Sequence, residues 1–221
     1  MPYCTKCGMK LPEDEEARFC PNCGAPIREV YRRTNADEIR PISGLKRLLL
    51  FFAVLLLCLI VTSAGALSNV NVTEAKTIVK DFNEMEEIIK KAGVRLIFGN
   101  NLMYCLIMFI PFIGPISGFY VLYSTGKVLA AISRTVGANP LILFMNIMIF
   151  PHAWLEYLSY SLAITESILL SIYLVKYKFR GVKAEATNVA KYIAVCSILL
   201  LLGAVIEMAL ISTSSSTLIS K

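Results

Sequence analysis

Residues 46–67 read KRLLLFFAVLLLCLIVTSAGAL, and this stretch decides the class of fold. Two basic residues open it, and none of the residues from 48 to 67 carries a charge. Because a helix rises ~1.5 Å per residue, a stretch of this length spans the ~30 Å hydrocarbon core of a bilayer. The stretch therefore predicts a transmembrane helix, and the basic pair at its start indicates the cytoplasmic side.

The composition of the whole chain agrees with a membrane protein. The 221 residues are 56% hydrophobic and 17% charged, whereas soluble proteins carry about 25% charged residues. The basic residues behind the net charge of +6 flank apolar segments instead of forming one patch, so we expect no nucleic-acid partner. The composition predicts a multi-pass protein of the cell membrane, in contact with membrane lipid.

The N-terminal residues 1–26 contain two C-x-x-C pairs, each followed by glycine, in CTKCG and CPNCG. A C-x-x-C turn directs both sulfur atoms at one ion, and the glycine permits the tight bend. Four thiolates complete the tetrahedral shell of Zn²⁺ and leave no position for water, so the pattern predicts a structural zinc ribbon. The expected ligands are Cys4, Cys7, Cys20 and Cys23.

Two disulfides are the alternative interpretation of these four cysteines. This alternative fits a cytoplasmic head poorly, because thiols stay reduced in that compartment. A segment this short buries too little apolar surface to fold alone, so metal binding is expected to supply its folding free energy. We expect the head to bind a cytosolic protein and to take no part in catalysis.

The basic residues predict the topology. Residues 27–45 form a basic linker, which together with Lys46 and Arg47 places the N-terminus in the cytoplasm. A second basic group marks another cytoplasmic loop, and it consists of Lys176, Lys178, Arg180 and Lys183.

The apolar segments predict an all-α polytopic membrane bundle over residues 46–213, followed by a polar tail at 214–221. About five transmembrane helices are expected, at residues 46–67, 96–113, 116–135, 141–178 and 192–212. Between the first two, residues 74–92 combine apolar residues at helical spacing with many charges. This pattern predicts an amphipathic helix on the outer face of the membrane.

The apolar segment 141–178 is too long for one crossing, because a helix of that length measures ~57 Å. Pro151 removes a backbone donor and clashes with the preceding turn, so we expect the helix to break near residue 151. With a half-helix before the break, the chain makes five crossings and its C-terminus lies outside. Six crossings, with the C-terminus inside, are the alternative.

Several polar side chains lie inside the apolar segments, where a charge costs ~2.5–3.5 kcal/mol on insertion scales. They are expected to face one another or water. His152, the one histidine of the chain, and Glu156 are four residues apart, which predicts a hydrogen bond between them. We expect Glu207 to pair with Lys127, although a lysine can also extend to the interface. The expected intramembrane polar cluster is Asn100, Asn101, Lys127, His152, Glu156, Glu166 and Glu207.

Four stretches of the membrane part resemble the stage II sporulation protein M family. The family signature Pro-His-Gly-x-x-Glu is present as PHAWLE at 151–156, with Ala153 in place of the glycine. The head resembles the small zinc-ribbon domains that precede many prokaryotic membrane proteins. The four stretches are FGNNL at 98–102, YSTGKVLAA at 123–131, FPHAWLEY at 150–157 and LLGAVIEMAL at 201–210.

The resemblance implies a non-enzymatic scaffold or assembly factor in an envelope complex. The family namesake acts in engulfment during spore formation, where it holds together a membrane complex with two peptidoglycan-acting partners. Other membrane or envelope proteins are therefore the implied partners, in a homo- or hetero-oligomer. Sporulation itself is not carried over to this chain, because the zinc-ribbon head is no part of the namesake.

Two other functions fit some of the residues. A transporter or channel would use the helix break and the ionisable side chains of His152, Glu156 and Glu207, since broken helices with such residues mark pathways in transporters. An intramembrane metalloenzyme fits less well, because one histidine and scattered acids make a poor metal site. The polar residues also have a purely structural interpretation, as hydrogen bonds that hold helices together.

Overall fold

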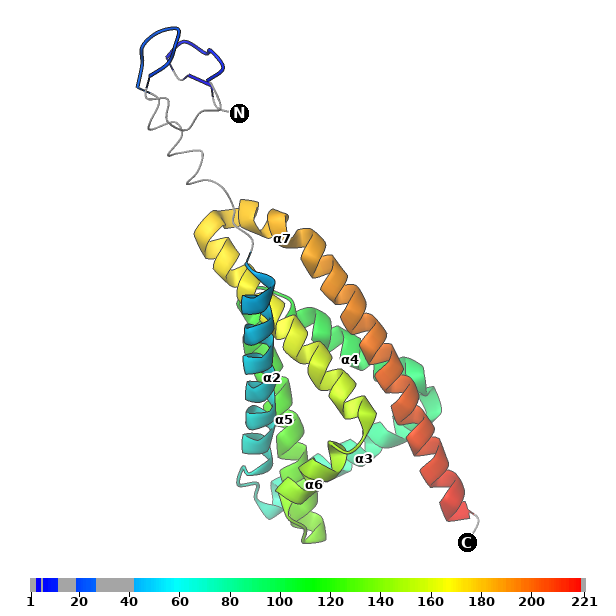
Figure 1. The fold of residues 1–221 in the computed structure, drawn as a ribbon. Coiled ribbons are helices and arrows are strands. Elements are labelled where there is room, and N and C mark those ends of the chain that lie inside the picture. The colour runs from blue at the N-terminus through cyan, green and yellow to red at the C-terminus, as the bar shows by residue number, and fades with distance from the viewer. Residues whose placement is uncertain (1–2, 5, 12–18, 27–41, 220–221) are drawn as a thin grey trace. The chain divides into compact units, whose positions relative to one another are not determined.

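The computed structural model describes residues 3–4, 6–11, 19–26 and 42–219. The chain divides into two compact units, Met1–Ile42 and Ser43–Lys221, which we call the head unit and the membrane unit. Most of the predicted basic linker, at 27–41, and the end of the predicted tail, at 220–221, lie outside the described residues. In the described part of the membrane unit the secondary structure is all-α (Figure 1), so the all-helical part of the predicted fold is confirmed.

Helix α2 (Gly44–Ala66) covers the first predicted span and crosses α5 (Ile113–Val136) at very short range. A Cβ atom on Gly65 would lie 2.2 Å from the Tyr123 carbonyl oxygen, and one on Gly126 would lie 2.1 Å from the Thr62 carbonyl oxygen. The two backbones therefore touch, which glycine alone permits. Small residues at such crossings are typical of helix pairs in membranes, where close packing replaces the hydrophobic effect.

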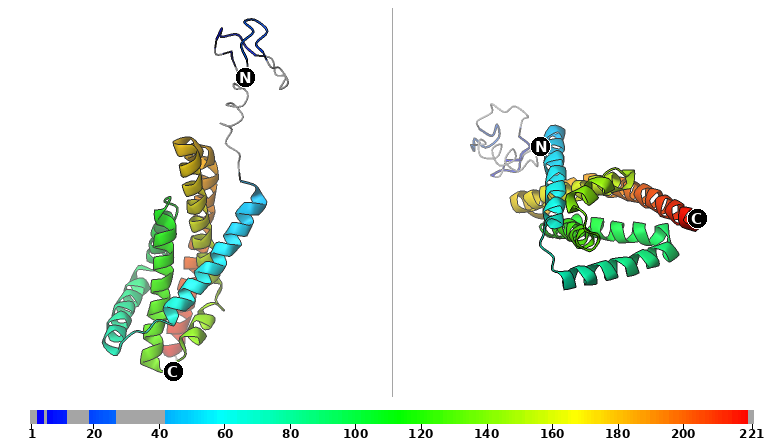
Figure 2. Two further views of the ribbon diagram at one scale, coloured as in Figure 1. Left: turned by 90° about the vertical axis from the view of Figure 1, so that its left-hand side faces the viewer. Right: turned by 90° about the horizontal axis from the view of Figure 1, so that it is seen from below.

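Helix α3 (Val72–Ala92) is amphipathic, and its two ends have clear causes. The Asn71 side chain caps the N-terminus by accepting a hydrogen bond from the Glu74 amide (2.8 Å). Gly93, with φ 68°, ends the helix in a conformation that glycine adopts without strain. Helix α4 (Val94–Met108) begins directly after this glycine, so α3 and α4 meet at an angle (Figure 2).

The turn from α4 to α5 is fixed by side chains of α7 (Pro151–Ile219). Phe112 has φ 64°, which is unfavourable for a residue with a Cβ atom. Its backbone N–H donates to the Ser171 hydroxyl oxygen (2.8 Å). The Ser167 hydroxyl donates to the Ile110 carbonyl oxygen (2.6 Å). Two serines of α7 thus hold the strained turn in place.

A short helix, α6 (Pro140–Ile147), precedes α7, and residues 148–150 separate the two. Asn139 caps α6 by accepting from the Leu141 amide (2.9 Å). The Trp154 ring N–H donates to the Met148 carbonyl oxygen (2.8 Å), which satisfies one of the acceptors that the end of a helix leaves open. The chain therefore breaks immediately before Pro151, and a hydrogen bond from Trp154 of α7 stabilises the break.

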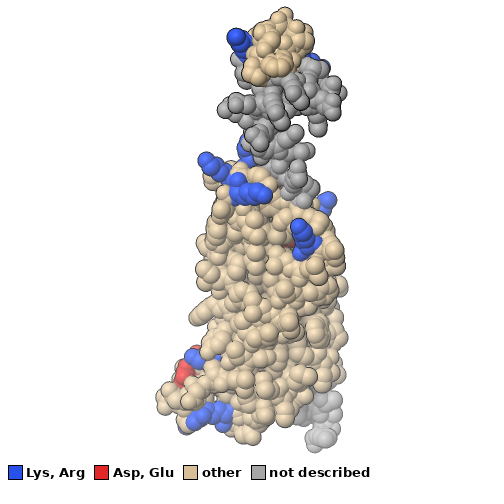
Figure 3. All heavy atoms as spheres, turned by 60° about the vertical axis from the view of Figure 1, so that its left-hand side comes forward, with Lys and Arg blue, Asp and Glu red and all other residues tan. Residues whose placement is uncertain are grey.

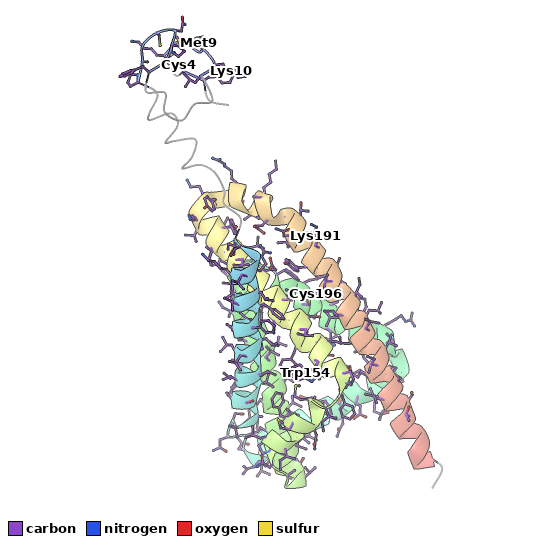
Figure 4. The ribbon with its side chains drawn as sticks, viewed as in Figure 1. Cys4, Met9, Lys10, Trp154, Lys191 and Cys196 are labelled. Carbon is purple, nitrogen blue, oxygen red and sulfur yellow. The ribbon has the colours of Figure 1, made fainter. Side chains whose placement is uncertain are left out.

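Helix α7 consists of two antiparallel arms, 151–177 and 179–219, that meet at Lys178 (Figure 1). Lys178 has non-helical backbone angles (φ 56°, ψ −151°). Cys196, labelled in Figure 4, donates its S–H to the Ser159 carbonyl oxygen of the other arm (3.5 Å). The second arm continues to Ile219, so the predicted tail at 214–221 is helical as far as its backbone is described.

Among the described residues, two helices, α2 and α7, are long and apolar enough to cross a membrane by length and composition, and α4 is apolar but shorter. The start of α2 and the bend of α7 lie at one end of the membrane unit, and the C-terminal end of α7 lies at the other (Figure 1). Figure 3 shows an uncharged band on one face of this unit, with basic side chains above it and charges of both signs below it.

Candidate functional site

Two similar turns bring the cysteines of the head unit together. In the first, the Gly8 N–H donates to the Cys4 carbonyl oxygen (2.8 Å), and in the second the Gly24 N–H donates to the Cys20 carbonyl oxygen (2.9 Å). The two glycines have left-handed φ values of 72° and 66°, which explains the glycine after each pair. Figure 4 labels Cys4 in the first turn.

The four cysteine sulfur atoms lie within 4.8 Å of one another. The sulfur atoms of Cys4 and Cys23 are 3.5 Å apart, and those of Cys7 and Cys20 are 3.6 Å apart. A disulfide would require ~2.05 Å, and all four cysteines are free. A tetrahedral ion with metal–sulfur bonds of ~2.3 Å separates its ligands by ~3.8 Å. The cluster therefore fits a bound metal ion.

The surroundings of Cys4 also favour the thiolate form that a metal ion binds. Backbone N–H groups of Lys6 and Cys7 point at the Cys4 sulfur and lower the pKa of Cys4 from 9.0 to about 6. Because metals bind the deprotonated form, a lowered pKa favours binding near neutral pH. Leu11 packs with Cys4 and Cys20 in a small buried cluster, so the cysteines form much of the head unit's core.

In the membrane unit, a buried ion-pair triad joins α2 to both arms of α7. The Arg47 guanidinium donates to both carboxylate oxygens of Glu166 (2.9 and 2.8 Å) and to Glu185 (2.7 Å). The side chains of Arg47, Glu166 and Glu185 are 11%, 1% and 5% exposed. The Asn188 amide also donates to Glu185 (2.9 Å), and the guanidinium lies 5.4 Å from the centroid of the Tyr192 ring.

The triad contains two residues that the sequence did not identify as part of the polar cluster. Hydrogen bonds from Asn188 and Arg47 satisfy the buried carboxylate of Glu185. Arg47 was interpreted as a basic flank of the first span, and Glu185 as part of a charged loop. The partners of Arg47 lie 119 and 138 residues away along the chain, so no local pattern could reveal them.

Glu156 bonds to α4 and not to His152, so the predicted hydrogen bond between them is wrong. The Asn101 amide donates to the Glu156 carboxylate (2.6 Å). His152 Nδ1 is buried without a hydrogen-bond partner among the described residues, and the ring stacks on Phe150 with 5.8 Å between centroids. Helical side chains tilt toward the N-terminus, which carries His152 back to the break and away from Glu156.

Lys127 pairs with Glu74 of α3, so its predicted pairing with Glu207 is also wrong. The Lys127 ammonium nitrogen lies 2.5 Å from a Glu74 carboxylate oxygen. Helix α3 packs against α5, where Ala75 and Ala131 share a buried cluster, and this brings the first turn of α3 to Lys127. The hydrogen bond with Lys127 lowers the pKa of Glu74.

The other predicted polar residues lie in two cavities. His152 and Glu207 line one of ≈ 500 Å³, between α3, the helix break and the second arm of α7. Asn100, Asn101 and Glu156 line another of ≈ 520 Å³, between α4, α5 and the first arm of α7. The single polar cluster that the sequence predicts is therefore divided between two cavities, the triad and the Lys127–Glu74 pair.

Two family models match the chain. The model described as Stage II sporulation protein M matches residues 48–212, which is most of the chain, and a zinc-ribbon domain model matches residues 3–27. Both resemblances noted in the sequence are confirmed, in the same order along the chain. Searches of the curated proteins and of the solved structures found no match.

Proposed function

We propose that this chain, which belongs to the stage II sporulation protein M family, is a multi-pass, non-enzymatic scaffold of an envelope complex. The observation that carries the proposal is the triad of Arg47, Glu166 and Glu185, which ties three helical segments together. These charges are directed at one another and not at a ligand. Buried charge pairs of this kind favour one arrangement of a bundle, because any other arrangement leaves a charge unpaired.

The proposed topology has five crossings, by α2, α4, α5 and the two arms of α7. The Arg47–Glu185 ion pair brings the two basic groups of the sequence to the same end of the membrane unit, as expected if that end is cytoplasmic. The C-terminal end of α7 lies at the opposite end (Figure 1), which supports an odd number of crossings. Helix α3 then lies at the outer face.

In this proposal the head unit holds Zn²⁺ through Cys4, Cys7, Cys20 and Cys23. Four thiolates leave the ion no open position, so its role is to fold the head and not to bind a substrate. The folded head presents a small surface to a cytosolic protein. At the other end, α3 presents exposed apolar side chains, including Met85 and Ile88 at 50% and 52% exposure, to lipid or to an envelope protein.

The zinc assignment is tested by replacing Cys4 and Cys7 with serine in the full-length chain. The variant is expected to bind no zinc by elemental analysis and to lose the dispersed NMR signals of the head unit. The membrane unit is expected to keep its helical circular dichroism and its melting temperature. A head unit that keeps dispersed signals without metal would contradict the assignment.

The scaffold role is tested by isolating the tagged full-length chain from its native membranes in mild detergent. Native mass spectrometry is expected to show a complex whose mass includes other proteins besides copies of the 24.5 kDa chain. The variant with Cys4 and Cys7 replaced is expected to lose only the cytosolic components. A chain that is recovered alone, or as a pure homo-oligomer, under cross-linking conditions would contradict the role.

A transporter remains the second candidate, because of the cavity that His152 and Glu207 line. A buried nitrogen without a partner, such as His152 Nδ1, is costly unless water or a ligand reaches it. Transport requires that a site be reached from both faces of the membrane in turn. A cavity that serves a static scaffold needs access from one face at most, and this difference separates the two functions.

A further inference from the structure

The second of the two cavities, between α4, α5 and the first arm of α7, is a groove lined by many residues with polar side chains, although it belongs to the proposed crossings. Its volume is ≈ 520 Å³. Of the twelve residues that line it, three are aliphatic and nine carry a hydroxyl, amide or carboxyl group. The nine are Asn100, Asn101, Tyr104, Ser117, Tyr120, Ser124, Thr125, Glu156 and Tyr160.

Part of this hydrogen-bonding capacity is unused within the protein. The hydroxyls of Ser117 and Thr125 donate to carbonyl oxygens of the preceding turn of α5. By contrast, the structure gives the side chains of Asn100, Ser124 and Tyr120 no hydrogen bond from any described residue. These three side chains are exposed or half-exposed, so their polar atoms are available to a polar ligand.

The groove contains one acidic side chain. Glu156 carries the one carboxyl group among the lining residues. Its hydrogen-bond partner is the neutral amide of Asn101 (2.6 Å), and no lysine or arginine of the described residues forms an ion pair with it. Lys127, which lies on α5, pairs with Glu74 instead. A carboxyl group held in a membrane without a counter-ion stays neutral, and a cationic ligand that pairs with it favours its ionised form.

Three tyrosines favour an organic cation over a bare metal ion. Tyr104, Tyr120 and Tyr160 line the same groove as Glu156, and aromatic faces attract ammonium groups. Side-chain oxygens of the groove, such as that of Ser124, can accept the N–H hydrogens of an ammonium group. We propose that this groove binds an organic ammonium group, with Glu156 as its counter-ion.

The ammonium group has two sources with the same chemistry, the headgroup of an aminophospholipid and a soluble primary amine. The aliphatic residues of the groove, Ile107, Val121 and Val128, suit the carbon atoms of either. A volume of this size is in the range of small-ligand sites. The binding proposal is independent of the scaffold role, so either can fail without the other.

Binding is measured with radiolabelled ethanolamine on the zinc-loaded full-length chain in phosphatidylglycerol nanodiscs. The wild type is expected to bind saturably. Glu156→Gln keeps the hydrogen bond from Asn101 but removes the charge, so it is expected to weaken binding tenfold or more. Glu207→Gln, a matched change in the other cavity, is expected to stay within twofold of the wild type.

The lipid source is tested in the same nanodiscs with phosphatidylethanolamine added, by native mass spectrometry. Retention of this lipid by the wild type but not by Glu156→Gln supports a headgroup ligand, and ethanolamine binding that the lipid does not reduce supports a soluble amine. A wild type that binds neither overturns the proposal, as does Glu156→Gln with unchanged binding. If Glu156→Gln fails to fold, Asn100→Leu decides, with an expected loss of threefold or more, and unchanged binding overturns the proposal.

Discussion

The two ends of the membrane unit are stabilised by different kinds of contact. At the end with the bend of α7, Arg47 is enclosed with two carboxylates whose side chains are 1% and 5% exposed. At the other end, the Lys127–Glu74 pair is 37% and 36% exposed, and His152 lines a cavity with an unpartnered nitrogen. The first end is closed by buried charges, whereas the second has a half-exposed ion pair and a buried nitrogen without a partner among the described residues.

The largest effect is expected from Arg47→Met, which leaves the carboxylates of Glu166 and Glu185 buried without their cation. Removal of one partner from a buried ion pair costs ~3–5 kcal/mol. Thermal unfolding in detergent, monitored by the labelling of the buried Cys58 and Cys196, measures the loss of stability. Arg134→Met, at an exposed position of α5, is the matched control and is expected to unfold like the wild type.

A triple variant sharpens this comparison. When Arg47→Met is combined with Glu166→Gln and Glu185→Gln, no buried charge remains uncompensated, so most of the stability should return. If the single variant is as stable as the wild type, or if the triple variant is less stable than the single one, the triad does not hold the bend of α7.

The next largest effect is expected at the glycine crossing, where backbone contact holds α2 and α5 together in the half that lies away from the bend of α7. A Cβ atom on Gly126 would lie 2.1 Å from a backbone oxygen of α2. Gly126→Ala is therefore expected to cost ~1–3 kcal/mol or more, as overpacking does. Gly99→Ala in α4 is the control, because nothing lies within 4 Å of its Cβ position. Equal unfolding temperatures of the two variants would contradict the crossing.

A smaller effect is expected from Lys127→Met, because the lost contact with Glu74 is partly exposed to solvent and such pairs stabilise little. The loss should be local to α3, whose first turn the contact ties to α5. Hydrogen exchange of the α3 amides is expected to accelerate in Lys127→Met. In the control Lys76→Met, at an exposed position of α3, the exchange rates should stay as in the wild type. Equal exchange rates in both variants would contradict a stabilising contact between Lys127 and Glu74.

The smallest effect is expected from acidification of the same contact. The pKa of Glu74 lies below 4.5 in the folded state because of its hydrogen bond with Lys127. A carboxyl group with a lowered folded-state pKa stabilises above its unfolded pKa and loses this contribution as the pH falls through its folded pKa. The difference in α3 exchange between the wild type and Lys127→Met should therefore shrink as the pH falls through the lowered pKa of Glu74 and vanish below it. A difference that persists there would exclude Glu74 as the partner.

The sequence predicts best those features whose partners are close along the chain. Cys4, Cys7, Cys20 and Cys23 are recognisable because each pair and its glycine form one turn, and the turns are short enough to meet. The apolar run that becomes α2 and the proline at which α7 begins are also local signals. Each of these depends on a few consecutive residues, so periodicity and spacing are sufficient.

The sequence fails where partners are chosen by packing between distant helices. Glu185 is as polar as its neighbours in a charged loop, and only the antiparallel arms of α7 bring it to Arg47. Lys127 has acids available in several segments, and the packing of α3 on α5 selects Glu74. His152 and Glu156 have the correct spacing for a hydrogen bond. However, His152 lies at the break before α7, and the Glu156 carboxylate accepts a hydrogen bond from Asn101 instead.

The central claim is that the membrane unit keeps one arrangement. In this arrangement the end with the bend of α7, which we propose to be cytoplasmic, is closed, and the unit is accessible only at the opposite end. The most direct test is the labelling of His152→Cys by a membrane-impermeant thiol reagent, added to each face of oriented vesicles. The background has Cys58, Cys105 and Cys196 replaced and the head loaded with zinc, and Lys80→Cys and Lys176→Cys mark the outer and cytoplasmic faces. The expected result is that position 152 is labelled from the outer face and never from the cytoplasmic face. Labelling from the cytoplasmic face would contradict the closed end and would favour a transporter.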